Sequence, residues 1–328
     1  MENNKKQHIT SVGGQALIEG IMMNGPKGAA MAVRKPDGEI QIDMKDFKHI
    51  REKIPFLGIP VVRGVVNFIE SMLIGYKCLM ASAEISGQLE EEEKPENMGK
   101  IDRWLTEHLN EKVFGVLTGI ASVLAFGLCF LLFFYAPTKL FELLNGLLIE
   151  KAQVDLYRLQ PLFEGILKMI LMVLYIFLVS RTKDIKRVFM YHGAEHKAIF
   201  CYEAGEELTV ENVRKFRRFH PRCGTSFIFV VLIISIFIST ALRLIVPETV
   251  TGILWVLIKL LILPLIMGVG YEVIKIAGKH NNIVTRILTA PGMWMQRITT
   301  NEPTDDIIEV GIAALKAVIT DNPEDDAV

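Results

Sequence analysis

Four apolar stretches, each close to twenty residues long, dominate the hydrophobic pattern of this chain. They cover about 113–136, 162–180, 227–246 and 252–274. A hydrocarbon core about 30 Å thick needs about 20 helical residues to cross it, so each stretch predicts a transmembrane helix. The first two helices fall within 113–180 and the last two within 227–274.

A fifth apolar stretch, 56–80, differs because polar side chains recur in it at helical spacing. One face of a helix would carry Arg63, Asn67, Glu70, Ser71 and Lys77, opposite an apolar face. Such an amphipathic helix lies at a membrane surface or packs against a helical bundle. We therefore interpret 56–89 as an amphipathic, membrane-associated helix. The acidic segment 90–112 is interpreted as a linker with a short helix.

The two ends of the chain lack such long apolar stretches and predict shorter elements. Within 1–55, the runs 13–23, 28–34 and 38–44 are separated by turn-forming Asn-Gly and Asp-Gly pairs, which predicts a small β-meander and then a short helix at about 43–53. Within 275–328 two helices are predicted, and Thr304 is a suitable N-cap for the second. The predicted fold class is mainly α: a polytopic membrane protein with about four transmembrane helices, a small α+β N-terminal part and C-terminal helices.

Basic residues near the spans set the expected topology. The segment 181–226, between the second and third spans, holds ten lysines and arginines, whereas 137–161 holds three and 247–251 holds none. Because lysine and arginine favour the cytoplasmic side, 181–226 and both termini are expected in the cytosol.

Composition narrows the classes of partner. A formal net charge of −1 indicates no nucleic-acid binding, and four scattered cysteines indicate no disulfide framework. The lipid bilayer is the expected partner. The G-x-x-x-G pattern at 115–119 would also suit helix packing within the chain or in a homo-oligomer.

The residues best suited to chemistry lie in 181–226. On a helix, His192 and His196 fall one turn apart on one face, so both imidazoles can bind one ion, and Glu195 lies beside them. This is the H-x-x-E-H order of inverted zincin metallopeptidases, in which Glu195 would be the catalytic base. Downstream, His220 and Cys223 form an H-x-x-C half-site. Three histidines and one cysteine are a ligand set typical of zinc.

Three interpretations of these residues stay open. Four ligands would close the coordination shell and make a structural site, whereas three would leave a position for catalysis. An inverted zincin also needs a third protein ligand, commonly a carboxylate, and 203–211 holds four glutamates: Glu203, Glu206, Glu207 and Glu211. A helical histidine pair also occurs on solvated helix faces without any metal.

A glycine-rich segment at 11–26 is the second notable motif. Gly13, Gly14 and Gly20 permit close backbone approach, and Gln15 and Glu19 lie four residues apart. The segment matches no phosphate-binding loop. It is interpreted as a glycine-permitted turn into a strand, and the alternative is that Gln15 or Glu19 reaches the metal site or a ligand.

Charged residues inside the spans need partners or access to water. Lys259 lies well inside the fourth span, so it is expected to face the bundle or a polar cavity, and Pro264 follows it. Glu164 and Lys168 are spaced to pair within the second span, and Arg243 is close enough to the end of the third span to snorkel.

The motifs "GGQALIEGIMMNGP", "YHGAEHK" and "HPRCGTSF", in this order and followed by spans, resemble those of the YqhQ family of bacterial membrane proteins. The resemblance extends over nearly the whole chain. It implies a multi-pass protein of the bacterial inner membrane and a predicted metal-dependent enzyme, with the metal motifs at His192, Glu195, His196, His220 and Cys223.

Three functions are therefore considered. The first is a zinc-dependent hydrolase. The second is a membrane scaffold or regulator that contains a structural zinc. The third is a transporter with Lys259 in its pathway.

Overall fold

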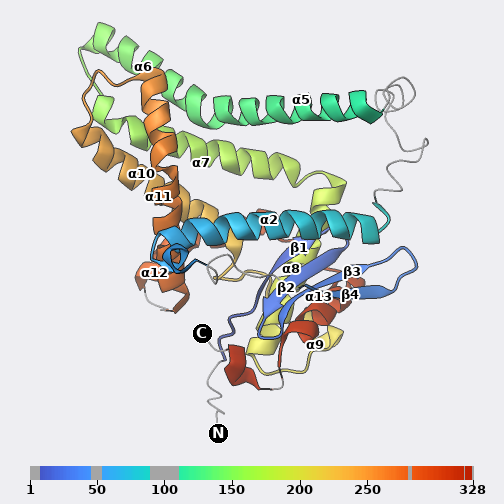
Figure 1. Cartoon of the computed structure of the whole chain (residues 1–328). Helices are drawn as coiled ribbons and strands as arrows, with labels where there is room; N and C mark the ends of the chain where they lie inside the picture. The colour runs from blue at the N-terminus through green and yellow to red at the C-terminus, as the bar shows by residue number, and fades with distance from the viewer. Residues whose placement is uncertain (1–7, 46–53, 89–110, 280–282, 321, 327–328) are drawn as a thin grey trace.

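The computed structural model describes residues 8–45, 54–88, 111–279, 283–320 and 322–326 (Figure 1). It is mainly helical, with long helices that form a bundle and one small antiparallel sheet. The predicted fold class is confirmed. The predicted linker at 90–112 lies almost entirely outside the described residues, as does most of the short helix expected at 43–53.

The sheet has four strands in meander order: β1 (Gly13–Leu17), β2 (Gly20–Gly25), β3 (Gly28–Arg34) and β4 (Ile40–Lys45). The sequence predicted one strand over 13–23, but the chain turns back at positions 18 and 19, where Glu19 adopts a φ of 50°. Gly20 then lies so close to β3 that a Cβ there would be 2.7 Å from the carbonyl oxygen of Ala32. The missing side chain therefore allows this hairpin to pack tightly.

Side chains alternate between the two faces of the sheet, and both faces are covered. Ile21, Met23, Ala30 and Ala32 pack against α8 (Lys183–Glu203) and α13 (Asp305–Val318). On the opposite face, Leu17, Met31 and Val33 pack against Cys78 of α2 (Val62–Ile85). Thr304 occupies the N-cap of α13, as predicted, although its side chain makes no capping hydrogen bond.

Helix α2 joins the sheet to the long helices. Its C-terminal half packs on the sheet, and its N-terminal half packs on α11 (Gly252–Lys279), where Gly64 meets Gly268 and Tyr271. The Phe68 ring also lies 5.7 Å from the ring of Phe227, near the start of α10 (Gly224–Ile245). Figure 1 shows α2 lying between the sheet and the rest of the bundle.

Within the described residues, five helices are long and apolar enough to cross a membrane. Four correspond to the predicted spans, and the fifth is α2. The first is longer than predicted: α5 (Glu111–Phe130) continues through a π-helical turn (Leu131–Tyr135) into α6 (Ala136–Ala152), with Pro137 just after the turn. The other three are α7 (Gln160–Val179), α10 and α11. Our interpretation of α2 as a surface helix stays a prediction.

Inside the bundle, the charged residues pair differently from the sequence expectation. Lys259 Nζ lies 2.6 Å from a Glu164 carboxylate oxygen and 2.6 Å from the Thr138 hydroxyl, so Glu164 pairs across helices and not with Lys168. Arg243 is buried, with its guanidinium 3.7 Å from the ring centroid of Tyr157, and does not snorkel to the bundle end. The sequence missed these contacts because they depend on how the helices rotate against each other.

Candidate metal centre

Helix α8 carries the histidine pair into the interior of the protein. Most of its second half is buried between the sheet, α13 and the chain that follows α12 (Ile283–Thr299). Gly193 makes this possible, because a Cβ there would lie 2.1 Å from the carbonyl oxygen of Asn301. His192 and His196 are thus not on a solvated helix face, and their ring centroids are 4.5 Å apart.

Cys223 completes a three-residue cluster with the two histidines. It is the N-cap residue of α10, and its Sγ lies 3.1 Å from His192 Nε2. One ligand atom from each of His192, His196 and Cys223 lies within 4.8 Å of the other two. Cys223 lies 31 residues after His192 in the chain and on another element, so the cluster is formed by tertiary packing.

Backbone carbonyls orient both imidazoles. His192 Nδ1 is 2.8 Å from the carbonyl oxygen of Thr299, and His196 Nδ1 is 2.6 Å from that of Arg218. Each Nδ1 therefore carries the proton, which leaves the Nε2 lone pair facing the cluster. His196 Nε2 is buried and has no hydrogen-bond partner in the described part of the chain. This is the arrangement of histidines that bind a metal ion.

The surroundings also favour the metal-binding protonation states. Burial lowers the pKa of His196, which keeps its ring neutral. Burial alone would raise the pKa of the Cys223 thiol, but the neighbouring His196 ring and the Thr225 hydroxyl and amide bring this pKa below its ordinary value. Neutral imidazole and thiolate are the forms that bind transition metals.

Glu195 lies next to this cluster and is fully enclosed. Burial raises the pKa of its carboxyl to about 7, against the opposing effects of the His192 ring and of the Gly14 amide, which donates a hydrogen bond to it. Its Oε2 atom is buried and has no partner among the described residues. A carboxyl group with a pKa near neutrality and an unused oxygen is suited to accept and return a proton.

Gly14 positions Glu195, and its substitution gives a first testable prediction. A Cβ at Gly14 would lie 2.6 Å from the carbonyl oxygen of Met22 and 3.1 Å from the Glu195 carboxyl. We expect Gly14→Ala to lower the free energy of unfolding by about 1–3 kcal/mol, as overpacking typically does. A Cβ at the neighbouring Gly13 meets nothing within 4 Å, so Gly13→Ala is the matched control. Thermal unfolding in detergent measures both, and equal midpoints would refute this role of Gly14.

His220 does not join the cluster, although the sequence predicted it as a fourth ligand. Its Nε2 lies 3.8 Å from the Glu203 carboxylate and 3.5 Å from the Arg222 guanidinium. Its backbone is fixed by Gln296, whose amide exchanges two hydrogen bonds with the His220 amide and carbonyl at 2.7 and 2.8 Å. The H-x-x-C turn thus directs the two side chains to different partners.

The four glutamates considered as a third metal ligand are not part of the cluster either. Glu203 accepts a hydrogen bond from the Thr10 amide at 3.0 Å and pairs with Arg222. Glu206, Glu207 and Glu211 are not part of the cluster.

The two N-terminal candidates have different positions. Gln15 borders the cavity beside the metal cluster, but its side-chain amide packs against Gly75 of α2 on the opposite face of the sheet. Glu19 pairs with Arg187 and accepts a hydrogen bond from the Tyr191 hydroxyl at 3.0 Å, away from the cluster. Gly13 and Gly14 begin strand β1, and neither Gln15 nor Glu19 is part of the metal cluster.

A cavity of about 440 Å³ opens onto the cluster. It is lined by β1, α8 and the turn before α10, and its lining includes His192, Glu195, His196, His220 and Cys223. The orienting carbonyls of Thr299 and Arg218 were missed by sequence reasoning because any residue carries a carbonyl. The contact of the Gly14 amide with Glu195 had one indication in the sequence, the adjacent glycines Gly13 and Gly14.

Comparisons with known proteins identify the family of this chain. Residues 59–321 match the model of a family described as a protein of unknown function (DUF1385). The chain is 36% identical over 317 residues to the "Uncharacterized protein YqhQ" of Bacillus subtilis (strain 168), covering 94% of this chain and 92% of that protein. No solved structure matches the chain. The resemblance stated from the motifs is thereby confirmed, and the chain belongs to the DUF1385 family that includes YqhQ.

Proposed function

We propose that this protein is a metal-dependent hydrolase of the bacterial inner membrane, with its metal centre on the cytoplasmic side. The observation that carries the proposal is the convergence of His192 Nε2, His196 Nε2 and Cys223 Sγ beside the unused oxygen of Glu195. Imidazole and thiolate ligands suit zinc. The basic residues in 181–226 support a cytoplasmic location for the site and for both termini.

Three ligands favour a catalytic site over a structural one. Zinc prefers four ligands in a tetrahedron, so three protein ligands leave one position for water or substrate. When bound, the ion would act as a Lewis acid toward the bond to be hydrolysed and toward water. Glu195 Oε2 would accept the proton released in the reaction and return it to the leaving group, and the Gly14 amide holds this carboxyl in place.

Elemental analysis and X-ray absorption of the purified protein test the metal site directly. We expect about one transition-metal ion per chain, with one sulfur and two imidazole nitrogens as protein ligands. His220→Ala should keep the metal, because His220 is outside the cluster. Loss of the metal in this variant, or a fourth protein ligand at the metal edge, would support the structural-zinc scaffold instead.

Glu195→Gln separates metal binding from catalysis. We expect this variant to keep its metal and to lower the hydrolysis of p-nitrophenyl esters or phosphates by about 100-fold or more, as loss of a general acid–base does. Glu206→Gln, an exposed carboxylate on the segment after α8, is the control. Full turnover in Glu195→Gln, or loss of its metal, would contradict the acid–base role.

A further inference from the structure

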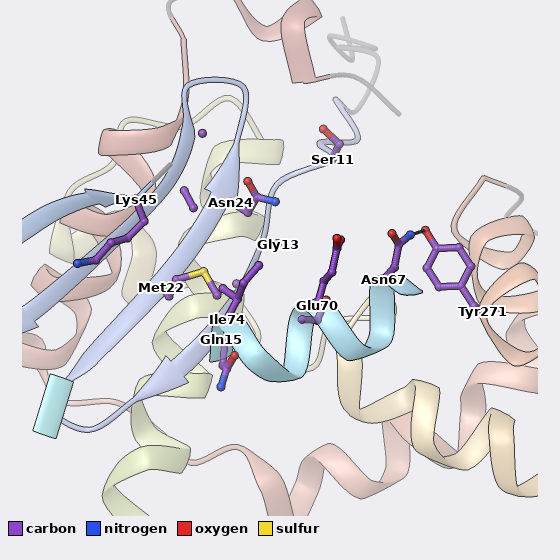
Figure 2. A pocket seen from close by; sticks show the side chains of 14 residues that line it. Ser11, Gly13, Gln15, Met22, Asn24, Lys45, Asn67, Glu70, Ile74 and Tyr271 are labelled. Atoms are coloured by element: carbon purple, nitrogen blue, oxygen red, sulfur yellow. Dashed lines mark hydrogen bonds between the residues drawn. The ribbon is translucent and has the colours of Figure 1, made fainter. Parts of the chain in front are cut away.

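A second cavity, of about 570 Å³, lies between one face of the sheet and the polar face of α2 (Figure 2). We name it the α2 cavity. Its polar lining includes Gln15, Asn24, Asn67, Glu70, Ser71 and Tyr271. We propose that the α2 cavity binds the uncharged, hydroxyl-rich head group of a membrane glycolipid and presents that lipid to the metal centre. The second half of this proposal rests on the proposed function.

The α2 cavity lies at the level of the bundle where a lipid head group would be found. Gly64 and Phe68 of α2 contact α11 and the first turn of α10, so the N-terminal half of α2 lies against these two helices near the sheet. Its polar stripe turns toward the cavity, whereas Ile69, Met72 and Leu73 are exposed on the other side. An amphipathic helix in this position buries its apolar face among acyl chains.

The lining chemistry matches a ligand with many hydroxyl groups. Amides and hydroxyls each donate and accept hydrogen bonds, as sugar hydroxyls do. The Asn67 amide nitrogen donates to the Tyr271 hydroxyl at 2.8 Å, which fixes the side chain, as Figure 2 shows. Asn67 Oδ1 is buried and has no hydrogen-bond partner in the described structure. Because a buried acceptor without a donor costs about 1–3 kcal/mol, this atom points to a ligand that donates.

The charge of the lining argues against a phosphate head group. Among the described residues that line the α2 cavity, Lys45 is the one cation, and it already lies 3.6 Å from the Asp43 carboxylate. Phosphate sites normally collect several cationic donors, and the described lining offers one, which is already paired.

The α2 cavity and the metal-site cavity meet at β1. Gly13, Gly14 and Gln15 line both of them. At Gly13 the space beyond the backbone is open, since a Cβ there meets no atom within 4 Å. A ligand whose head group binds against Asn67 can therefore extend past Gly13 toward Glu195.

Thiol protection tests the head-group site in the full-length, metal-loaded protein. The variant Ser71→Cys places a thiol at the exposed rim of the α2 cavity. The protein is embedded in phosphatidylglycerol nanodiscs that contain a few mole per cent of either monoglucosyl diacylglycerol or phosphatidylethanolamine with the same acyl chains. Peptide mass spectrometry then follows the reaction of position 71 with a water-soluble maleimide. Lys77→Cys, exposed on the same helix outside the lining, is the control thiol.

We expect the glucosyl lipid to slow labelling at position 71 about tenfold, because a bound ligand in a pocket is largely enclosed. Phosphatidylethanolamine should have little effect, and Asn67→Ala should remove the protection. No protection, equal protection by both lipids, or equal protection at position 77 would overturn the inference. Metal content is measured in the same samples. Protection without metal would refute the proposed hydrolase alone, and metal without protection would refute the glycolipid site alone.

Discussion

Cys223→Ser is expected to abolish metal binding. Cys223 supplies the thiolate of the cluster, and its Sγ lies 3.1 Å from His192 Nε2. A serine hydroxyl at neutral pH stays protonated and is a poor ligand for zinc, so we expect affinity to fall by several orders of magnitude. Elemental analysis after dialysis against a weak chelator measures the loss.

Cys201→Ser provides the matched control. Cys201 lies on α8, the helix of the two histidines, and is buried, and burial raises the pKa of its thiol to about 11. It therefore stays a thiol and packs as a small apolar group. The control should keep a full complement of metal. Equal metal content in the two serine variants would refute the proposed ligand set.

Lys259→Ala is expected to destabilise the bundle strongly without affecting the metal. Lys259 and Glu164 side chains are 5% and 2% exposed, and their charged atoms lie 2.6 Å apart. Removing the cation leaves the Glu164 carboxylate buried and without its charged partner, which typically costs about 3–5 kcal/mol. Thermal unfolding in detergent should show the loss, with metal content unchanged.

A double variant tests whether the pair explains this effect. Lys259→Met combined with Glu164→Gln removes both charges at similar volume, so most of the stability should return. Lys168→Ala is the control, because Lys168 contacts the Phe134 ring rather than a carboxylate. Full stability of Lys259→Ala would contradict a structural role. Measured solute flux in proteoliposomes that is lost in Lys259→Ala and in the double variant would favour the transporter hypothesis.

The local part of the fold could be predicted from the sequence. Hydrophobic length revealed the spans, and alternation revealed β3 and β4, because both patterns belong to consecutive residues. The π-helical turn at Leu131–Tyr135 was missed because the apolar residues continue through it without a break. The hairpin at positions 18 and 19 was missed because Ile18 and Glu19 lack the usual turn residues.

The site was predicted only in part. Helical spacing placed His192 beside His196, and the structure buries both beside Cys223. The same half-site suggested His220, but this ring, 5.5 Å from that of His196, faces Glu203 and Arg222 and is not part of the cluster. Glu203 and Gln296 lie 17 and 76 residues from His220, so spacing along the chain carried no signal for them.

By itself, the sequence determined the helical class, four of the five helices that are apolar enough to cross a membrane, and the one-turn spacing of the histidines. These follow from the periods of helix and strand, which depend on neighbouring residues. The tertiary structure decided which side chains meet: Gly14 with Glu195, Thr299 with His192, and Lys259 with Glu164. Each of these contacts joins segments more than 90 residues apart, and close packing of whole elements, not local pattern, sets such distances.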